Sequence, residues 1–147
     1  MKINFTKKEF RTLLELAHLG DWMLHAHDTR DNPETEPHRA VLQKIYSHFK
    51  EMGCEDLIEV SDGEFYETRR LEDAMQLHVE RYDNESFWEE LLSRLAVRDS
   101  IKQVGEDAYN AMDGYERIVL TSEKEEAWSE EFEKNGLARI AVGKVAS

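Results

Sequence analysis

The sequence predicts a mainly helical fold, and three observations support this prediction. Apolar side chains recur at intervals of three and four residues along most of the chain. Several of these segments begin with a helix-capping residue, and only two of the 147 residues are proline. Three Trp, five Tyr and six Phe give the chain enough aromatic surface for a packed core. We therefore expect one compact domain, residues 1–147, of about five helices with the first helix at its centre.

The N-terminal segment combines a possible strand with a well-marked helix start. Residues 1–5 alternate in polarity and predict a short strand. Thr6 and Glu9 have the spacing of a capping box, so the first helix is expected to begin there. Gly20 interrupts this helix and leaves two alternatives open. Either the helix ends and restarts with Asp21 as its N-cap, or it continues and places the Asp21 carboxylate in the apolar face, where it needs a partner.

The next elements are a loop, a second helix and a possible hairpin. Residues 28–37 are polar and turn-forming, and a second helix is expected from about Pro37 to Gly53. The segment 57–66 carries the turn signal Asp62–Gly63 and is compatible with a hairpin. A small sheet built from this segment and the two termini would make the fold α+β, which is the alternative fold class.

Two separate helices are expected in the middle of the chain. The first follows Thr68 and carries an apolar stripe with His78 at its centre, where a histidine is usually a core residue with one satisfied ring nitrogen. The second follows the capping residues 83–86, among which Ser86 forms a capping box with Glu89. Its apolar and polar residues fall on opposite faces, as in an amphipathic helix.

The C-terminal third is less sharply patterned. A short helix is expected within residues 101–112. Residues 117–121 are either a strand or part of a longer helix capped by Asp113. That helix is expected to end at Gly136. Residues 137–145 are interpreted as a strand or an ordered tail.

Charge and cysteine content limit the possible functions. The chain has 32 acidic and 19 basic residues, a net charge of −13, and no basic face of the kind that binds nucleic acid. No apolar run approaches the ~18 residues of a membrane span. The single cysteine, Cys54, excludes an intrachain disulfide and is expected to be a buried thiol in a reducing compartment. We therefore expect a cytoplasmic protein that binds neither nucleic acid nor membranes.

One histidine constellation is a candidate metal site. His18, Asp21 and His25 are spaced by three and four residues, so they share one side of the first helix if that helix is continuous through Gly20. Two imidazoles and a carboxylate can hold a divalent metal and leave one position open for water. The alternative is an Asp–His pair at the edge of the core. Phosphate-binding glycine loops and nucleophile-elbow motifs do not occur.

Three residues are candidate interface residues. Trp22 lies on the polar side of the first helix, and Trp128 lies off the apolar stripe of its own helix. Exposed tryptophans often anchor interfaces. Leu16 belongs to a second apolar side of the first helix, which suggests that this helix is either central or shared with a partner.

These observations favour a non-enzymatic protein-interaction or accessory module over an enzyme. The expected partner is another protein or a second copy, with a homodimer formed through the first helix or the helix that begins at Ser86. No cofactor is expected, apart from a divalent metal if the histidine site is real. The alternatives are a metal-binding helical protein or metal-dependent hydrolase, and an acidic inhibitor or immunity-type protein that neutralises a basic partner.

Overall fold

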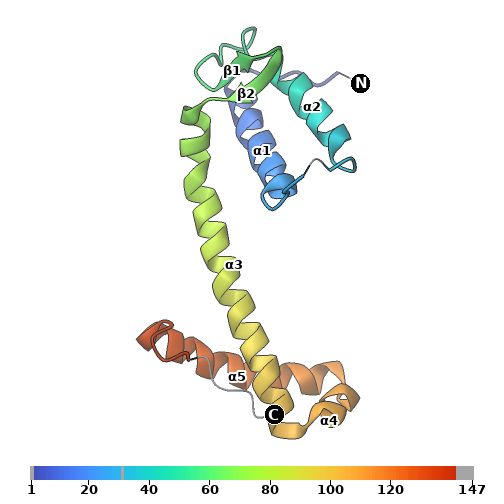
Figure 1. Ribbon diagram of the computed structural model, residues 1–147, viewed down its shortest axis with the longest axis vertical. Coiled ribbons are helices and arrows are strands. Elements are labelled where there is room, and N and C mark those ends of the chain that lie inside the picture. Colours follow the sequence, from blue (N-terminus) through green and yellow to red (C-terminus); the bar gives the residue numbers. More distant parts are fainter. Residues whose placement is uncertain (1, 31, 142–147) are drawn as a thin grey trace. The chain divides into compact units, whose positions relative to one another are not determined.

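The computed structural model describes residues 2–30 and 32–141. Within these residues the fold is mainly helical, with five helices and one two-stranded antiparallel sheet, as the sequence predicts (Figure 1). Contacts divide the chain into two compact units: an N-terminal unit, Met1–Arg81, and a C-terminal unit, Tyr82–Ser147. That the whole chain behaves as a single domain, with its first helix at the centre, stays a prediction.

Helix α1 (Lys7–His25) begins with the predicted capping box, in which Thr6 Oγ1 accepts from the amide of Glu9 and the Glu9 carboxylate accepts from the amide of Thr6. The helix is continuous through Gly20. The alternative in which it ends there and restarts with Asp21 as N-cap is therefore wrong. Residues 2–6 form no strand, so this prediction is wrong. The amide and carbonyl of Thr6 are instead used by the start of α1.

Helix α2 (Glu36–Tyr46) has Pro37 in its first turn, as predicted, but it ends earlier than Gly53. Tight turns replace the predicted last part of α2, and Gly53 closes them with a φ of 69°. The chain then enters β1 (Ile58–Ser61) and β2 (Glu64–Glu67), which pair from Ile58↔Glu67 to Ser61↔Glu64.

The predicted hairpin is therefore present, and its turn explains why. Asp62 and Gly63 have φ values of 50° and 85°, the left-handed geometry that a two-residue hairpin turn requires. Within the described residues the sheet contains only these two strands, so the N-terminal segment does not add a third.

The prediction of two helices after Thr68 is wrong, because α3 (Arg69–Val104) is one helix of 36 residues. Residues 83–86 resemble a helix start, but they include neither glycine nor proline, and nothing there breaks the backbone hydrogen bonds. His78 is exposed rather than part of the core. The buried positions of this part of α3 are Leu71, Met75 and Val79. His78 lies beside this buried stripe on the helix surface.

A glycine and a capping box set the bounds of the C-terminal helices. Gly105, with a φ of 88°, separates α3 from α4 (Glu106–Ala111), the short helix that was predicted within residues 101–112. Helix α5 (Gly114–Asn135) includes residues 117–121, so the helical alternative is correct there, and its start is the capping box of Asp113 and Glu116. Residues 137–141 are not a strand, and 142–145 lie outside the described residues.

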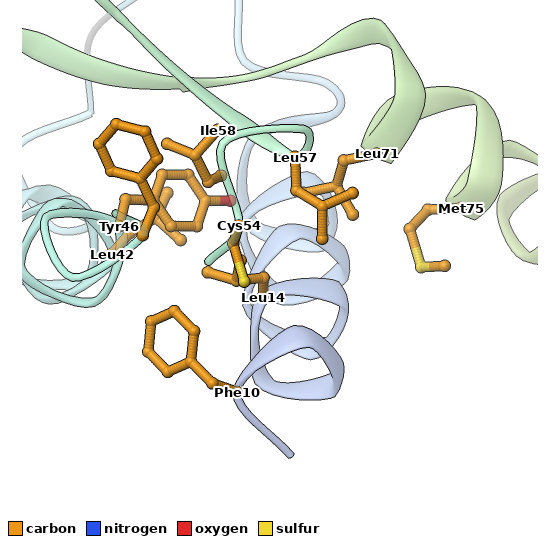
Figure 2. Packing of buried hydrophobic residues seen from close by; sticks show 10 residues of the cluster. Phe10, Leu14, Leu42, Tyr46, Cys54, Leu57, Ile58, Leu71 and Met75 are labelled. Atoms are coloured by element: carbon orange, nitrogen blue, oxygen red, sulfur yellow. The ribbon is translucent and has the colours of Figure 1, made fainter. Parts of the chain in front are cut away.

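The N-terminal unit has an enclosed core to which each of its helices and strand β1 contribute (Figure 2). Leu14 and Tyr46 have no exposed surface, and Cys54 is buried as predicted. Burial raises the pKa of the Cys54 thiol. The full cluster is Phe10, Leu14, Leu42, Tyr46, Phe49, Cys54, Leu57, Ile58, Leu71 and Met75.

The C-terminal unit is built differently. Helix α5 crosses the C-terminal half of α3 (Figure 1). Among its described residues only Ala96, Ser100 and Phe132 are buried, and Ala96 and Ser100 are small side chains one turn apart on α3. In neither unit do the described residues include a helix long and apolar enough to cross a membrane.

Candidate interaction surface

The polar side of α1 is held by hydrogen bonds within the N-terminal unit. His25 Nδ1 lies 3.1 Å from Asp21 Oδ1 and 2.9 Å from the Asp21 carbonyl oxygen. His25 Nε2 lies 2.8 Å from Thr35 Oγ1, in the loop before α2. The Asp21 carboxylate therefore has the partner that a continuous helix requires, and both ring nitrogens of His25 contact protein groups.

His18 faces a different partner. Its Nδ1 lies 3.1 Å from Glu67 Oε1 on β2, and the Tyr46 hydroxyl donates to the same oxygen at 2.7 Å. Burial raises the pKa of Glu67, but hydrogen bonds from His18 and Tyr46 outweigh burial and leave this pKa below its ordinary value. Burial, together with the hydrogen bond to Glu67, raises the pKa of Tyr46. This network joins α1, α2 and β2 through largely buried groups.

The predicted metal ligands are therefore engaged in two separate sets of contacts. His18 contacts Glu67, whereas Asp21 and His25 contact each other. In the part of the chain that the structure describes, no three His, Cys, Asp or Glu side chains are grouped as metal ligands. A metal site at His18, Asp21 and His25 stays a prediction, and the observed hydrogen bonds give these residues a structural role.

The predicted interface residues of α1 are unequally placed. Leu16 is 63% exposed, and Met23, seven residues further on, lies on the same outer face and is also exposed. Trp22 is half-buried. An interface at Leu16 and Trp22 stays a prediction.

Trp128 belongs to an aromatic cluster, which we define as Phe87, Trp88, Trp128 and Phe132. Phe132 is its centre, with ring centroids 5.3 Å from Trp88 and 5.4 Å from Trp128. Trp128 Nε1 donates to Asp99 Oδ2 at 2.9 Å. Hydrogen bonds from Arg98 and from Trp128 lower the pKa of Asp99. These contacts fix the indole and explain why Trp128 is half-buried.

A hollow of about 430 Å³ opens beside Trp128 within the C-terminal unit. Apolar side chains of Ala127, Trp128, Phe132 and Ile140 line it, and Glu131 and Arg139 form an ion pair of 3.0 Å at its edge. The complete lining is Asp99, Lys124, Ala127, Trp128, Glu131, Phe132, Gly136, Arg139 and Ile140.

The first two turns of α5 expose a second apolar feature, the α5 apolar stripe, which we define as Tyr115, Ile118 and Val119. Their exposed fractions are 76%, 63% and 44%. The spacing of three and four residues places them on adjoining positions of the helix surface. These residues were not among the predicted interface residues, because residues 117–121 were equally compatible with a strand. Their helical spacing would have been the signal.

Acidic residues continue the outer face of α5 beyond the stripe. We define the α5 glutamate row as Glu123, Glu126, Glu130 and Glu133, which follow Val119 by 4, 7, 11 and 14 residues. All four are exposed. Among the described residues only Glu130 has an ion-pair partner, Lys134 at 3.1 Å.

The N-terminal unit has an apolar groove of its own, of about 420 Å³, between residues before α1, α1 itself and α2. Its charged groups are few and mixed in sign, since Lys44, His48 and Glu51 line the same edge. The lining residues are Ile3, Asn4, Phe5, Phe10, Leu13, Val41, Lys44, Ile45, His48, Glu51 and Met52.

Comparison of the chain with models of protein families, with curated proteins and with solved structures finds no match. The function therefore has to be inferred from the residues and surfaces described above.

Proposed function

We propose that the protein is a non-enzymatic protein-interaction module that binds a partner protein through helix α5 of its C-terminal unit. The observation that carries this proposal is the α5 apolar stripe, in which Tyr115 is 76% and Ile118 is 63% exposed. Large apolar side chains grouped at one place on a surface are typical of interaction sites. Covering them removes apolar surface from water, which contributes roughly 25 cal/mol per Å² before the costs of association.

The composition of the C-terminal unit supports the same proposal. Its described part buries Ala96, Ser100 and Phe132, while Phe87 and Tyr115 stay exposed. A unit that encloses so little of its own apolar surface gains more from a partner than one with a complete core. A tyrosine in the exposed group also fits, since tyrosine is enriched among the residues that dominate binding energy.

Co-purification tests the proposal. The tagged protein would be isolated at moderate salt from the cells that make it, as wild type and as a Tyr115→Ser/Ile118→Ser double variant. We expect a protein that co-purifies in a fixed ratio with the wild type and is lost with the double variant. Because both side chains are largely exposed, circular dichroism should stay unchanged.

Leu77→Ser provides the matched control, because Leu77 is 71% exposed and also lies within a helix, α3. The control should retain the co-purifying protein. Equal retention by the double variant, or the absence of any protein in a fixed ratio, would contradict the proposal.

A further inference from the structure

We infer the chemistry of the partner, an inference that rests on the proposed function: it is a protein with an apolar groove bordered by lysine or arginine side chains, in which α5 lies as a helix. Binding of an amphipathic helix in a groove is a common mode of recognition, with anchors spaced by three, four and seven residues. On α5 two of the apolar anchors, Tyr115 and Val119, share one face with the acidic residues, and this combination indicates the chemistry of the partner.

Tyr115 and Val119 of the apolar stripe lie in line with the glutamate row on one face of α5, and Ile118 lies beside this face, about 100° from Val119 around the helix. Tyr115 and Val119 are four residues apart, and Glu123, Glu126, Glu130 and Glu133 continue the same helical spacing. At 1.5 Å per residue, the distance along the helix from Val119 to Glu133 is about 21 Å. A complementary groove would therefore contact apolar side chains at one end and a row of carboxylates along the rest.

The opposite face of α5 is already used within the C-terminal unit. Trp128 and Phe132 lie on that face, where Trp128 bonds to Asp99 of α3 and Phe132 contacts Trp88 of α3. The stripe and the row lie on other sides of α5 and are exposed together, and Glu126 and Glu133 also line hollows that α5 forms with α3. No rearrangement of the unit is needed to present them.

The negative charge of this face favours a different protein over a second copy of this chain as the partner. The chain has a net charge of −13, and two α5 helices packed by their outer faces would bring carboxylates together. The hollow beside Trp128 offers Lys124 and Arg139, but also Asp99 and Glu131. The groove of the N-terminal unit, with Lys44 and Glu51, has no basic excess either. A partner with its own basic residues is therefore the better fit.

Such a complex gains a long-range attraction as well as contact. Opposite charges around an apolar patch speed association and exclude acidic competitors. Salt screens this contribution over about 8 Å at physiological ionic strength. Binding is therefore expected to weaken as salt rises, which an apolar contact alone does not do.

The test uses the full-length protein and a defined probe, a 14-residue peptide of leucine and lysine with leucines at helical spacing. Its affinity is measured by titration calorimetry against three proteins: wild type, a Glu123→Gln/Glu126→Gln/Glu133→Gln triple variant, and a Glu55→Gln/Glu59→Gln/Glu72→Gln control. Both triple variants remove three exposed carboxylates, so they have the same net charge. We leave Glu130 unchanged because it pairs with Lys134.

We expect the α5 triple variant to bind the peptide roughly tenfold more weakly and with a smaller salt dependence, and the control to stay within about twofold. A matching peptide of leucine and glutamate should not bind the wild type. Equal weakening of both triple variants would mean that the peptide responds to net charge alone, and would overturn the inference. Absence of peptide binding to the wild type would overturn it as well.

Two further outcomes separate this inference from the proposed function. If Tyr115→Ser/Ile118→Ser weakens peptide binding and the α5 triple variant does not, the basic partner is wrong although α5 remains an interaction surface. If sedimentation shows a wild-type dimer that Tyr115→Ser/Ile118→Ser dissociates, the occupant is a second copy and the inference is wrong.

Discussion

The two units of this protein differ in how many of their apolar side chains they bury. In the N-terminal unit, side chains from α1, α2, β1 and α3 converge, and Leu14 and Tyr46 lose all contact with solvent (Figure 2). In the C-terminal unit, α5 crosses α3 and its aromatic cluster is bordered by open hollows, one beside Trp128 and one beside Trp88. The same chain therefore contains one unit with an enclosed core and one in which few of the described side chains are buried.

We expect stability to depend mainly on the buried side chains and binding to depend mainly on the exposed ones. Enclosed side chains stabilise the fold through burial and close packing, so removing them lowers the free energy of unfolding strongly. Exposed side chains on a helix contribute little to folding, and they can therefore be retained for binding.

The largest effect is expected for Leu14→Ala in the N-terminal unit. Leu14 has no exposed surface, so its truncation should lower the free energy of unfolding by about 3 kcal/mol or more through lost burial and a residual cavity. Urea unfolding measures this, with Trp22 as the reporter after Trp88→Phe and Trp128→Phe. Leu16→Ala, two residues along α1 but largely exposed, should cost less than about 0.5 kcal/mol.

The same variant tests whether the chain is one cooperative domain. Its effect on the C-terminal unit is followed by amide exchange of α5. A loss of protection in α5 equal to that in α1 would mean that the two units unfold together, as the sequence predicts. Unchanged protection in α5 would mean that the units are thermodynamically separate.

A smaller effect is expected for Phe132→Ala in the C-terminal unit. Phe132 contacts both Trp88 and Trp128, so its removal disrupts the aromatic cluster. Because the cluster is bordered by open hollows, the cost should be about 2 kcal/mol, below that of an enclosed ring. Tryptophan fluorescence in a Trp22→Phe background measures it, with Tyr115→Ala as the exposed control. If Phe132→Ala and Tyr115→Ala cost the same, the cluster is not what stabilises this unit.

The smallest effect is expected for Arg11→Met, which removes a charge at the edge of the N-terminal core. The Arg11 guanidinium donates two hydrogen bonds to Asp56, at 2.8 and 2.7 Å. These bonds lower the pKa of Asp56 from 3.8 to about 2. Since both side chains are about a third exposed, solvent screens the pair, and we expect its loss to cost about 1 kcal/mol or less at pH 7.

The pH dependence of this cost follows from the direction of the shift. A carboxyl group with a lowered pKa stabilises the folded state above its ordinary pKa, and this contribution disappears as the pH falls from about 4 to about 2. An NMR titration of Asp56 should give a higher pKa in Arg11→Met, although Arg70, 3.0 Å away, retains part of the shift. An unchanged titration would show that Arg11 does not hold this carboxylate in solution.

Local signals in the sequence predicted most helix starts. Thr6 with Glu9 and Asp113 with Glu116 form the expected capping boxes, because a cap depends only on residues three positions apart. The Asp62–Gly63 turn was predictable for the same reason. Residues 83–86 show the limit of such signals, since a possible cap inside α3 does not end a helix that has no breaker.

The candidate site was less predictable than the fold. Trp128 was selected from the sequence, but its bond to Asp99 of α3 depends on how α5 crosses that helix. His78 was assigned to a core and is exposed, because periodicity identifies a helix face without identifying what covers it. Tyr115 and Ile118 were not selected, since helical spacing alone does not show that other elements leave them exposed.

The helical class, the caps, the hairpin turn and the acidic composition follow from residue content and short-range spacing, so they can be read from the sequence. Which apolar faces are enclosed depends on the packing of the folded chain. This packing buries Leu14 among elements distant in sequence, pairs His18 with Glu67 across 49 residues, and leaves the α5 stripe uncovered. Burial depends on contacts between distant segments. Hydrophobic periodicity is the same for a helix face that packs inside the protein and for one that stays exposed.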